Sequence, residues 1–384
     1  MRIAVLSDTL FPYRQGGRET LHFQRATRLA RRGHAVRLYT MHWWPEPERE
    51  LVRDGVVLRA IAPRLPIYSA SGRRSIVQSI VFGLSAIRLL FGPAFDVLDV
   101  DQFPLFHLFA ARLVCSLRRR PLTATWHEVW DAAYWRSQIG WLGPLGFLLQ
   151  RAAARQADLV FANSALTATR LNTWLGVDPR RIVILPPSGV ETIPNREPLP
   201  RTVDCIFVGR LLPHKHVDLL VRAVATLPGV SLLILGTGPE RDRLQALAAE
   251  LGLSDRVSIE APGTHEAVME RLRAARLLTF PSTREGFGIA VLEANACGVP
   301  ALVVKHPDNA AVETVRDGDN GIVCELGTAA IAAAVEAFLK DPSRQSAMSK
   351  AAQRVASAYS WETYVSRMLG HLQSIVPAAL REAA

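Results

Sequence analysis

The sequence predicts an α/β protein made of two Rossmann-like domains with parallel sheets. Its 384 residues exceed the usual size of a single domain, so two domains are the natural expectation. The chain opens with an apolar strand at 1–7, a helix that ends at Arg32 and a second strand at 35–40, and this βαβ order implies a parallel sheet. Another strand, which is followed by Gly209, begins at Val203 after a proline-rich stretch at 186–202, and it opens the second domain.

The proline-rich stretch is the expected linker between the domains. We assign residues 1–190 to an N-terminal domain and residues 191–360 to a C-terminal domain. Four prolines break the segment 41–75, and no long element is predicted there. Further strands of the first domain are expected at the apolar runs 96–101, 122–126, 158–164 and 182–185.

The most apolar helical segment is 75–91, SIVQSIVFGLSAIRLLF, which Arg73 and Arg74 precede. It is shorter than the ~20 residues that span a bilayer, and it carries Gln78 and Arg88. Two placements are open: the helix packs against the first sheet, or it lies partly in a membrane interface. No stretch of the sequence is predicted to cross a membrane.

Two features of the first domain suit ligand binding. Gly16 and Gly17 precede the first helix, where missing side chains let a backbone approach a ligand. His127 follows the strand at 122–126, and ligands bind beyond the carboxyl ends of parallel strands. Taken alone, a glycine pair usually makes a turn and a lone histidine is usually structural.

The second domain shows the same alternation of strands and helices. Its first strand ends at Gly209 and Arg210, and Lys215 follows in the sequence HKHVD. Two cations beside a strand end can neutralise a diphosphate, although a solvated charged face is the plainer interpretation. Further strands are expected at 231–236, 257–259, 277–280 and 301–304, and helices at 266–275 and 361–376.

The segment 280–300, FPSTREGFGIAVLEANACGVP, organises this domain. A helix is expected from about Gly288 to Gly298, and Gly298 is its expected left-handed cap. The preceding strand, the glycine loop and the start of the helix leave unpaired backbone N–H groups, which suit an anion. Glu285 lies before the helix and Glu293 about two turns inside it. This pair is too widely spaced for a glycosidase but suits the two ends of a long ligand. Alternatively, Glu293 faces solvent and Glu285 only starts the helix.

Charge is distributed unevenly along the chain. Residues 1–190 hold 25 arginines and no lysine against 13 acidic residues, a net charge of +12, whereas residues 191–384 carry −2. This asymmetry favours an anionic membrane surface as partner of the first half, and no nucleic-acid-binding motif accompanies it. The four cysteines form no C-x-x-C pair and are expected as buried thiols of a reducing compartment.

Glu285 and Glu293, with the sequences GFG and ACGVP around them, resemble the signature of the retaining family 4 glycosyltransferases. That family has the GT-B fold, in which two Rossmann-like domains face each other with a nucleotide sugar in the cleft. The resemblance covers nearly the whole chain, from the Gly16 loop to the final helix. It implies that this helix, at about 361–384, crosses back to the first domain.

The resemblance also implies roles for individual residues. Arg210 and Lys215 match the pair that holds the leaving diphosphate, Glu285 the residue that holds sugar hydroxyls, and Glu293 the residue that holds the ribose. His127 matches a histidine near the reactive carbon of the donor. The other donor-binding positions that it implies are Gly16, Gly17, Gly209, Gly236, Thr264, Phe287, Gly288 and Ile289.

Several positions depart from the family pattern. Ser188-Gly189-Val190-Glu191 replaces the usual Asn-Gly-Val-Asp in the linker, His216 replaces a glycine after Lys215, and Thr237 replaces an aspartate. Asp99-Val100-Asp101 has the residue pattern of the D-x-D manganese motif, which belongs to the other large glycosyltransferase fold. Nothing around it resembles that fold, so we interpret it as a strand end.

The expected function is transfer of a sugar from a nucleotide diphosphate sugar to an acceptor hydroxyl, with retained configuration and no obligatory metal or cofactor. A lipid-linked or cell-envelope glycan is the expected acceptor, and the expected location is cytoplasmic, peripheral on the inner face of the membrane. One alternative is a nucleotide-sugar epimerase of the same fold. Another is a non-catalytic protein that binds sugar nucleotides or a membrane surface. A phosphorylase is disfavoured because no lysine has the context of a pyridoxal phosphate site.

Overall fold

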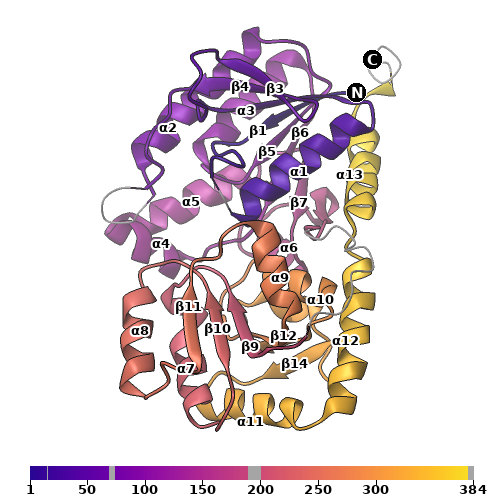
Figure 1. The fold of residues 1–384 in the computed structure, drawn as a ribbon. Helices are drawn as coiled ribbons and strands as arrows, with labels where there is room; N and C mark the ends of the chain where they lie inside the picture. Colours follow the sequence, from indigo (N-terminus) through magenta and orange to yellow (C-terminus); the bar gives the residue numbers. More distant parts are fainter. Residues whose placement is uncertain (15, 69–73, 189–199, 379–384) are drawn as a thin grey trace. The chain divides into compact units, whose positions relative to one another are not determined.

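A computed structural model describes residues 1–14, 16–68, 74–188 and 200–378 of the chain. The chain divides into two compact units (Figure 1): unit 1 is Met1–Pro186 with Glu362–Ala384, and unit 2 is Pro187–Trp361. The sequence-based boundary at 190/191 lies four residues further along the chain. Arg73 and the linker motif from Gly189 to Glu191 lie outside the described residues.

Unit 1 is built on a sheet of eight strands in the order β3-β4-β2-β1-β5-β6-β7-β8. β3 runs antiparallel to β4, and the other neighbouring strands pair in parallel. The strand order reverses between β1 and β5, so the carboxyl ends of these strands form a topological switch point. The strands are β1 (Arg2–Leu6), β2 (Ala35–Met41), β3 (Glu50–Arg53), β4 (Val56–Ala62), β5 (Val97–Asp101), β6 (Leu122–Trp126), β7 (Leu159–Ala162) and β8 (Ile182–Ile184).

Helices of unit 1 connect and cover these strands. The final helix, α13, pairs Glu362 with Arg32 and places His371 against Phe161, so it packs on unit 1 as predicted. The helices are α1 (Gly17–Arg31), α2 (Ile76–Ser85), α3 (Phe106–Arg118), α4 (Ala132–Ile139), α5 (Gly143–Ala154), α6 (Ala165–Thr173) and α13 (Trp361–Ile375), with the 3₁₀ turns η1 (Ala86–Phe91), η2 (Gly140–Leu142) and η3 (Pro179–Arg181).

A β-hairpin occupies part of the segment for which no element was predicted. Asp54 and Gly55 connect β3 to β4, and both have positive φ, at 50° and 79°. Two such residues make the turn that fits the twist of a hairpin, and Asp-Gly is the sequence typical of it. The prolines around this hairpin masked a local signal that was present in the sequence.

The predicted helix at 75–91 begins as an α-helix and continues as the 3₁₀ turn η1. Its inner face packs on α3 and β4, with Phe82 buried and Gln78 donating a hydrogen bond of 3.0 Å to Asp8. Its outer face leaves Val77 and Leu84 exposed. Among the described residues, no helix has both the length and the hydrophobicity needed to cross a membrane.

Unit 2 contains a parallel sheet of six strands in the order β11-β10-β9-β12-β13-β14. The order reverses between β9 and β12, which gives this unit its own switch point. The strands are β9 (Val203–Val208), β10 (Leu232–Leu235), β11 (Val257–Glu260), β12 (Ala275–Phe280), β13 (Ala301–Val304) and β14 (Gly321–Cys324). The helices are α7 (Val217–Ala225), α8 (Arg241–Glu250), α9 (His265–Arg273), α10 (Ile289–Ala296), α11 (Thr328–Leu339) and α12 (Pro342–Ser357), with the 3₁₀ turns η4 (Pro213–Lys215) and η5 (Ala310–Thr314).

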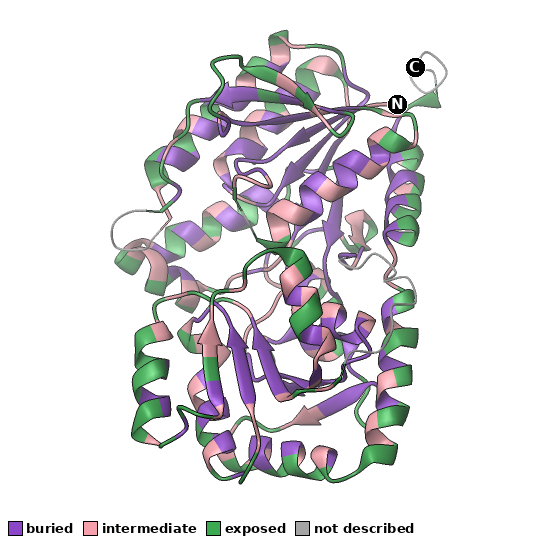
Figure 2. Cartoon of the chain, in the orientation of Figure 1, coloured by how far each residue is buried: buried purple, intermediate pink, exposed green. Residues whose placement is uncertain are grey.

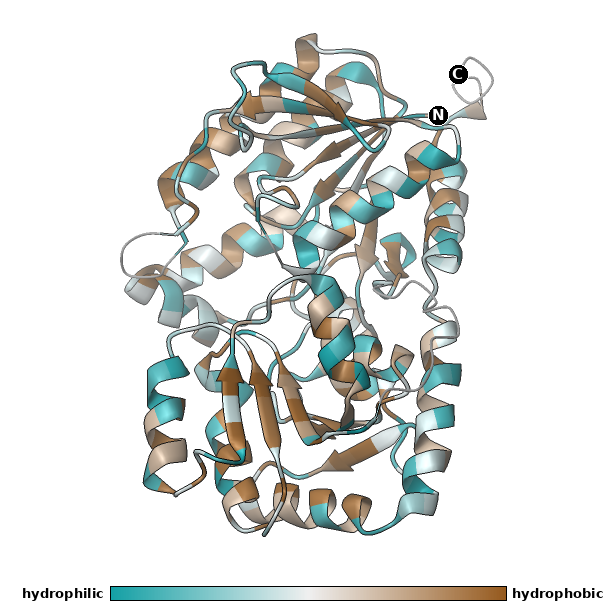
Figure 3. Cartoon of the chain, in the orientation of Figure 1, coloured by the Kyte–Doolittle hydropathy of each residue, from teal (hydrophilic) through white to brown (hydrophobic). Residues whose placement is uncertain are grey.

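The strands carry the cores of both units. Figure 2 shows the strands largely buried, and Figure 3 shows them rich in hydrophobic residues. In the described part of the chain the cysteines are free thiols. Cys115, Cys205 and Cys297 are buried as expected, whereas Cys324 is only partly buried.

Helix α10 ends where the sequence predicts. Gly298 has a φ of +66°, and the N–H of Val299 donates to the carbonyl of Ala294 at 2.8 Å. A β-carbon at position 298 would lie 2.9 Å from the side chain of Gln353 on α12. The left-handed conformation favours glycine here, and a side chain would also displace Gln353.

A fully buried ion pair joins α1 to the first sheet. Arg25 pairs with Asp99 and donates to the hydroxyl of Thr125 at 2.8 Å, and the hydroxyl of Thr123 donates to Asp99 at 2.8 Å. Arg25 and Asp99 are both inaccessible to solvent. Each charge therefore depends on the other for compensation in a region of low dielectric constant.

Removal of this cation should destabilise unit 1 strongly. We expect Arg25→Met to lower the free energy of unfolding by about 3–5 kcal/mol, because Asp99 is left buried and unpaired. Arg32→Met is the control, since Arg32 pairs with Glu362, which is 82% exposed, and it should cost less than about 1 kcal/mol. Urea unfolding of both variants measures the difference, and equal losses would contradict the proposed importance of burial.

Candidate active site

The predicted donor residues of unit 2 gather at its switch point. Gly209 and Arg210 follow β9, and Glu285 lies in the loop between β12 and α10. The backbones of the loops after β9 and β10 touch, because a β-carbon at Gly236 would lie 2.2 Å from the carbonyl oxygen of Gly209. Gly236 is thus required for close packing of the two loops that bound the site.

Lys215 and Glu285 form an ion pair at the centre of this site. The side chain of each is 12% exposed, and the ammonium nitrogen lies 5.1 Å from the ring centre of Phe280 at the end of β12. The pair joins the turn before α7 to the loop before α10. The ion pair therefore fixes the position of the Lys215 ammonium group.

Other cations lie near His214, the residue before Lys215. Burial, together with the neighbouring charges of Lys215, Arg284 and Arg210, lowers the pKa of His214 to about 4. His214 is therefore neutral at pH 7, while three permanent cations lie close to it. Arg210 itself is exposed. Such a set attracts an anion with several negative oxygens, such as a diphosphate.

The loop that carries Glu285 is fixed by its backbone. The N–H of Glu285 donates to the carbonyl of Asp308, and the N–H of Ala310 donates to the carbonyl of Glu285, both at 3.0 Å. Gly288 then starts α10 with a φ of +86°. The first N–H groups of the helix at Ile289 add a positive partial charge to this region.

Three predicted donor residues also have structural uses of their own. The side chain of Phe287 is 5% exposed and packs in a small core cluster with Leu292 and Ala356, so only its backbone is available to a ligand. The hydroxyl of Thr264 caps α9 by accepting the N–H of Ala267 at 3.2 Å. A β-carbon at Gly288 would lie 2.7 Å from that of Ala311.

Glu293 is a carboxyl group in an unusual environment. It lies in α10, its side chain is 15% exposed, and burial raises its pKa to about 7. The Nδ1 atom of His265 lies 3.6 Å from its Oε1 atom. At neutral pH, Glu293 is partly protonated, so it can both donate a hydrogen bond to a hydroxyl group and accept one.

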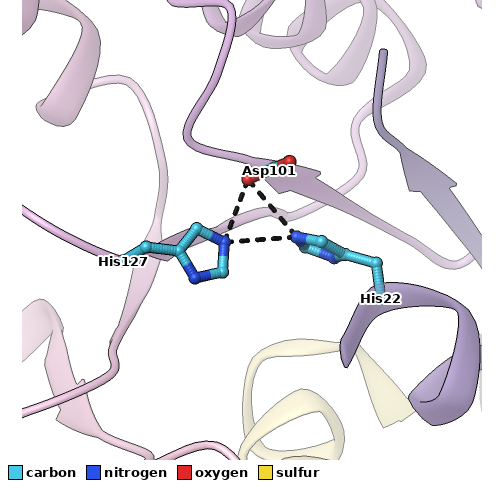
Figure 4. Close-up of side chains that lie close together, drawn as sticks. All are labelled: His22, Asp101 and His127. Carbon is cyan, nitrogen blue, oxygen red and sulfur yellow. Dashed lines mark hydrogen bonds and ion pairs between the residues drawn. The ribbon is translucent and has the colours of Figure 1, made fainter. Parts of the chain in front are cut away.

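The predicted residues of unit 1 lie at or near the other switch point. His127 follows β6, and its Nε2 atom lies 3.1 Å from Oδ1 of Asp101, the last residue of β5. His22 of α1 approaches the same oxygen at 3.3 Å, and the two Nε2 atoms are 3.4 Å apart. Figure 4 shows both rings directing one nitrogen at this carboxylate.

The environment of this cluster fixes its charges. Burial lowers the pKa of His22 to about 3, so its ring is neutral at pH 7. Burial opposes ionisation of Asp101, but Arg18 and the two histidines overcome it and hold the pKa of Asp101 well below its usual range. Arg18 lies 3.0 Å from Oδ2, the other oxygen of Asp101. A carboxylate thus persists where no solvent reaches it.

His127 is also held from its other side. Its Nδ1 atom lies 2.7 Å from Nδ2 of Asn163, and its backbone N–H donates to Oε1 of Gln102 at 2.9 Å. Its side chain is 18% exposed, whereas Asp101 is fully buried. His127 is therefore the member of the cluster that a ligand can reach.

The predicted glycine pair marks the start of α1. Gly16 precedes the helix with extended backbone, and Gly17 is its first residue. A β-carbon at Gly16 would lie 2.5 Å from a carboxylate oxygen of Glu19. A side chain at Gly16 would therefore require the carboxylate of Glu19 to move, close to the arginine that pairs with Asp101.

Sequence reasoning missed most of this cluster. Arg18, His22 and Arg25 occur at i, i+4 and i+7, which places them on one face of α1. Asp99 and Asp101 lie on one face of a buried strand. A polar stripe on a helix and paired carboxylates on a buried strand were the available signals that the two elements meet.

Comparisons with known proteins identify the family and the fold. Residues 15–192 match the family described as Glycosyltransferase Family 4, and residues 191–355 match Glycosyl transferases group 1. The D-inositol 3-phosphate glycosyltransferase of Acidothermus cellulolyticus is 30% identical, over 82% of this chain and 83% of its own. The enzyme of that name from Nocardia farcinica is also 30% identical, over 94% of this chain and 86% of its own.

Solved structures share the fold at lower identity. Sucrose-phosphate synthase from Thermosynechococcus elongatus covers 100% of both chains with a TM-score of 0.80 and 20% identity. Anabaena HepE in complex with UDP covers 97% of this chain and 100% of its own, with a TM-score of 0.75 and 18% identity. WaaG, a glycosyltransferase involved in lipopolysaccharide biosynthesis, covers 98% and 100%, with a TM-score of 0.73 and 21% identity. The chain therefore belongs to the family 4 glycosyltransferases, the group 1 glycosyl transferases, and has the GT-B fold.

Proposed function

We propose that this glycosyltransferase moves a sugar from a nucleotide diphosphate sugar to an acceptor hydroxyl, with retention of anomeric configuration. The observation that carries the proposal is the Lys215–Glu285 ion pair at the switch point of unit 2, with Arg210 and the start of α10 beside it. A uridine diphosphate sugar is the proposed donor, because structures of Anabaena HepE are described in complex with UDP and with UDP-glucose.

The charges of the site match the demands of the transfer step. The bond between the anomeric carbon and the diphosphate oxygen breaks, and a bond to the acceptor oxygen forms on the same face. The departing phosphate oxygen takes the proton of the acceptor hydroxyl, so atoms and charges balance without a side-chain nucleophile or a metal. Lys215, Arg210 and the N–H groups of α10 stabilise the negative charge that grows on the diphosphate. In this proposal Glu285 and His127 hold sugar hydroxyls, and Glu293 holds the ribose.

A lipid-linked or cell-envelope glycan is the proposed acceptor, reached by docking on an anionic bilayer. Unit 1 presents an apolar face on neighbouring elements: α2 packs on α3, and α3 contacts η1 and α5. Trp141 and Phe91 are 87% and 85% exposed. The other members of this apolar face are Ile76, Val77, Ile80, Leu84, Leu113, Leu117, Leu145 and Leu148.

Charge favours an anionic bilayer as the occupant of this face. Arg119 follows α3, Arg136 lies in α4 and Arg151 lies in α5, and all three are exposed. Residues 1–190 carry a net charge of +12. Tryptophan and long apolar side chains enter the boundary between headgroups and acyl chains, while the arginines pair with lipid phosphates.

Loss of the central cation should weaken donor binding. We expect Lys215→Ala to raise the dissociation constant for UDP about 10- to 100-fold, because a charge-assisted contact is worth about 1.5–3 kcal/mol. Lys340→Ala is the matched control, since Lys340 is exposed and pairs with the exposed Glu336 of α11. Calorimetry measures UDP binding, and equal effects of both substitutions would contradict the assignment.

The reaction itself is tested by a panel of UDP, GDP and ADP sugars. Thermal shift identifies the donor that binds, and mass spectrometry then identifies the product formed with a lipid-linked acceptor or with D-inositol 3-phosphate. Glu285→Ala should abolish the product while UDP still binds. Interconversion of donors without any acceptor would instead identify an epimerase, and unchanged transfer by Glu285→Ala would remove that residue from the proposed site.

The raised pKa of Glu293 predicts a pH-dependent stability. The folded protein keeps a proton that the unfolded chain releases, so this contribution is complete below about pH 4.5 and is lost as the pH rises to about 7. Glu293→Gln does not titrate, and it should therefore be more stable than the wild type at pH 8, by about 3 kcal/mol at 1.4 kcal/mol per pKa unit. Urea unfolding at pH 5 and pH 8 measures both proteins, and a difference that does not change with pH would refute the assignment.

Membrane docking is tested with vesicles. The protein should sediment with vesicles that contain phosphatidylglycerol, bind less at high salt, and bind poorly to pure phosphatidylcholine. Replacement of Val77, Leu84 and Trp141 by serine should weaken binding at least about 10-fold, because apolar area is no longer buried. Val52→Ser, a change at an exposed position on β3, is the control. Salt-independent binding, or no binding to either vesicle, would overturn the proposal.

A further inference from the structure

Three side chains of unit 1 converge on one small region from three different elements. His22 comes from α1, Asp101 from the end of β5 and His127 from the residue after β6 (Figure 4). The ligand-type atoms of these residues all lie within 4.8 Å of one another. Two imidazoles and a carboxylate are donors that zinc and other late first-row divalent ions bind.

The separations of the donor atoms fit such an ion. Oδ1 of Asp101 lies 3.3 Å from Nε2 of His22 and 3.1 Å from Nε2 of His127, and the two nitrogens are 3.4 Å apart. Bonds of about 2.0–2.1 Å in a tetrahedral site require ligand separations of about 3.3–3.4 Å. We propose that His22, Asp101 and His127 bind a divalent ion of the zinc class and leave its fourth position open.

The carboxylate is presented as a one-oxygen ligand. Arg18 lies 3.0 Å from Oδ2 of Asp101, and the hydroxyl of Ser7 lies 3.3 Å from the same oxygen. Oδ1 is left to face the two histidines. Outer groups that orient a ligating carboxylate in this way are a regular feature of metal sites.

The histidines can both present a lone pair at Nε2. The side-chain amide of Asn163 meets Nδ1 of His127 at 2.7 Å, and an amide can serve that nitrogen through its NH₂ group or its oxygen. With the oxygen turned inward, Nδ1 carries the proton and Nε2 is the ligand. Within the described residues, Nδ1 of His22 has no hydrogen-bond partner, so an ion that takes Nε2 can shift the ring proton to Nδ1 without breaking a hydrogen bond there.

Charge and access also favour a cation. The network around the cluster contains the carboxylates of Asp8, Glu19 and Asp101 and the guanidinium groups of Arg18 and Arg74, which leaves one negative charge in excess. His127 is 18% exposed and gives the ion a route from solvent. A water molecule or a substrate oxygen can occupy the open position on that side.

This site goes beyond the proposed transfer reaction, which uses no metal ion. In the proposed function the ring of His127 binds a sugar hydroxyl, and an ion bound to its Nε2 atom would compete with that hydroxyl for the ring. The two uses of His127 therefore exclude each other, and zinc is expected to inhibit transfer. Metal binding is measured without donor or acceptor, so its failure is separate from failure of the proposed function.

Cobalt is the probe, because tetrahedral Co²⁺ absorbs visible light. The metal-free full chain, without a histidine tag, is titrated with Co²⁺, and intense visible bands should saturate near one equivalent and disappear on addition of Zn²⁺. His22→Gln and Asp101→Asn should lose the bands, and His42→Gln, a change at a histidine outside the cluster, should keep them. Asn163→Leu should weaken Co²⁺ binding roughly 10- to 100-fold.

Circular dichroism and thermal unfolding verify that each variant is folded. His127→Gln is the second ligand variant, since its partly exposed side chain can be replaced with little risk to the core. Absence of saturable bands in the wild type would overturn the site. Bands that persist in both folded histidine variants, His22→Gln and His127→Gln, would also overturn it.

Discussion

Pairing of buried charge between α1 and β5 is the constraint on which unit 1 depends. Asp99 and Asp101 are fully buried on one strand face, and the low dielectric constant there makes an unpaired carboxylate costly. Helix α1 supplies Arg25 for the first and Arg18 for the second. Both pairs form only when the helix lies in one register against the strand. That register also brings His22, which lies between the two arginines, to Asp101 and His127.

The same network reaches the apolar face of unit 1. Gln78 of α2 donates a hydrogen bond to Asp8, and Asp8 pairs with Arg18, which in turn holds Asp101. The helix proposed to meet the membrane and the cluster proposed to meet the donor or a metal ion thus share one chain of polar contacts.

In unit 2 the positions of the site loops depend on backbone conformation rather than on buried charge. Its switch point is shaped by glycines that allow loops to touch and by a helix whose start is fixed at Gly288. The permanent cations remain near the surface, where an anionic ligand can reach them. Lys215 is the exception, because its side chain is only 12% exposed and pairs with Glu285.

The sequence by itself determined the local features of this protein. Alternating strands and helices indicated two parallel-sheet domains, and glycine and proline marked both ends of α10, because backbone conformation depends on neighbouring residues. The resemblance to a family predicted that Lys215 and Glu285 share one site, and the two residues form an ion pair. Asp54-Gly55 is likewise a local sequence signal, typical of a β-hairpin turn, although no element was predicted there.

Only the tertiary structure decided which distant polar groups meet. His22, Asp101 and His127 are separated by up to 105 residues and come together because β1, β5 and β6 are neighbours in the sheet. Strand order results from the packing of the whole domain, and no local pattern encodes it. The near-neutral pKa of Glu293 likewise arises from burial, which depends on what surrounds α10 rather than on the residues within it.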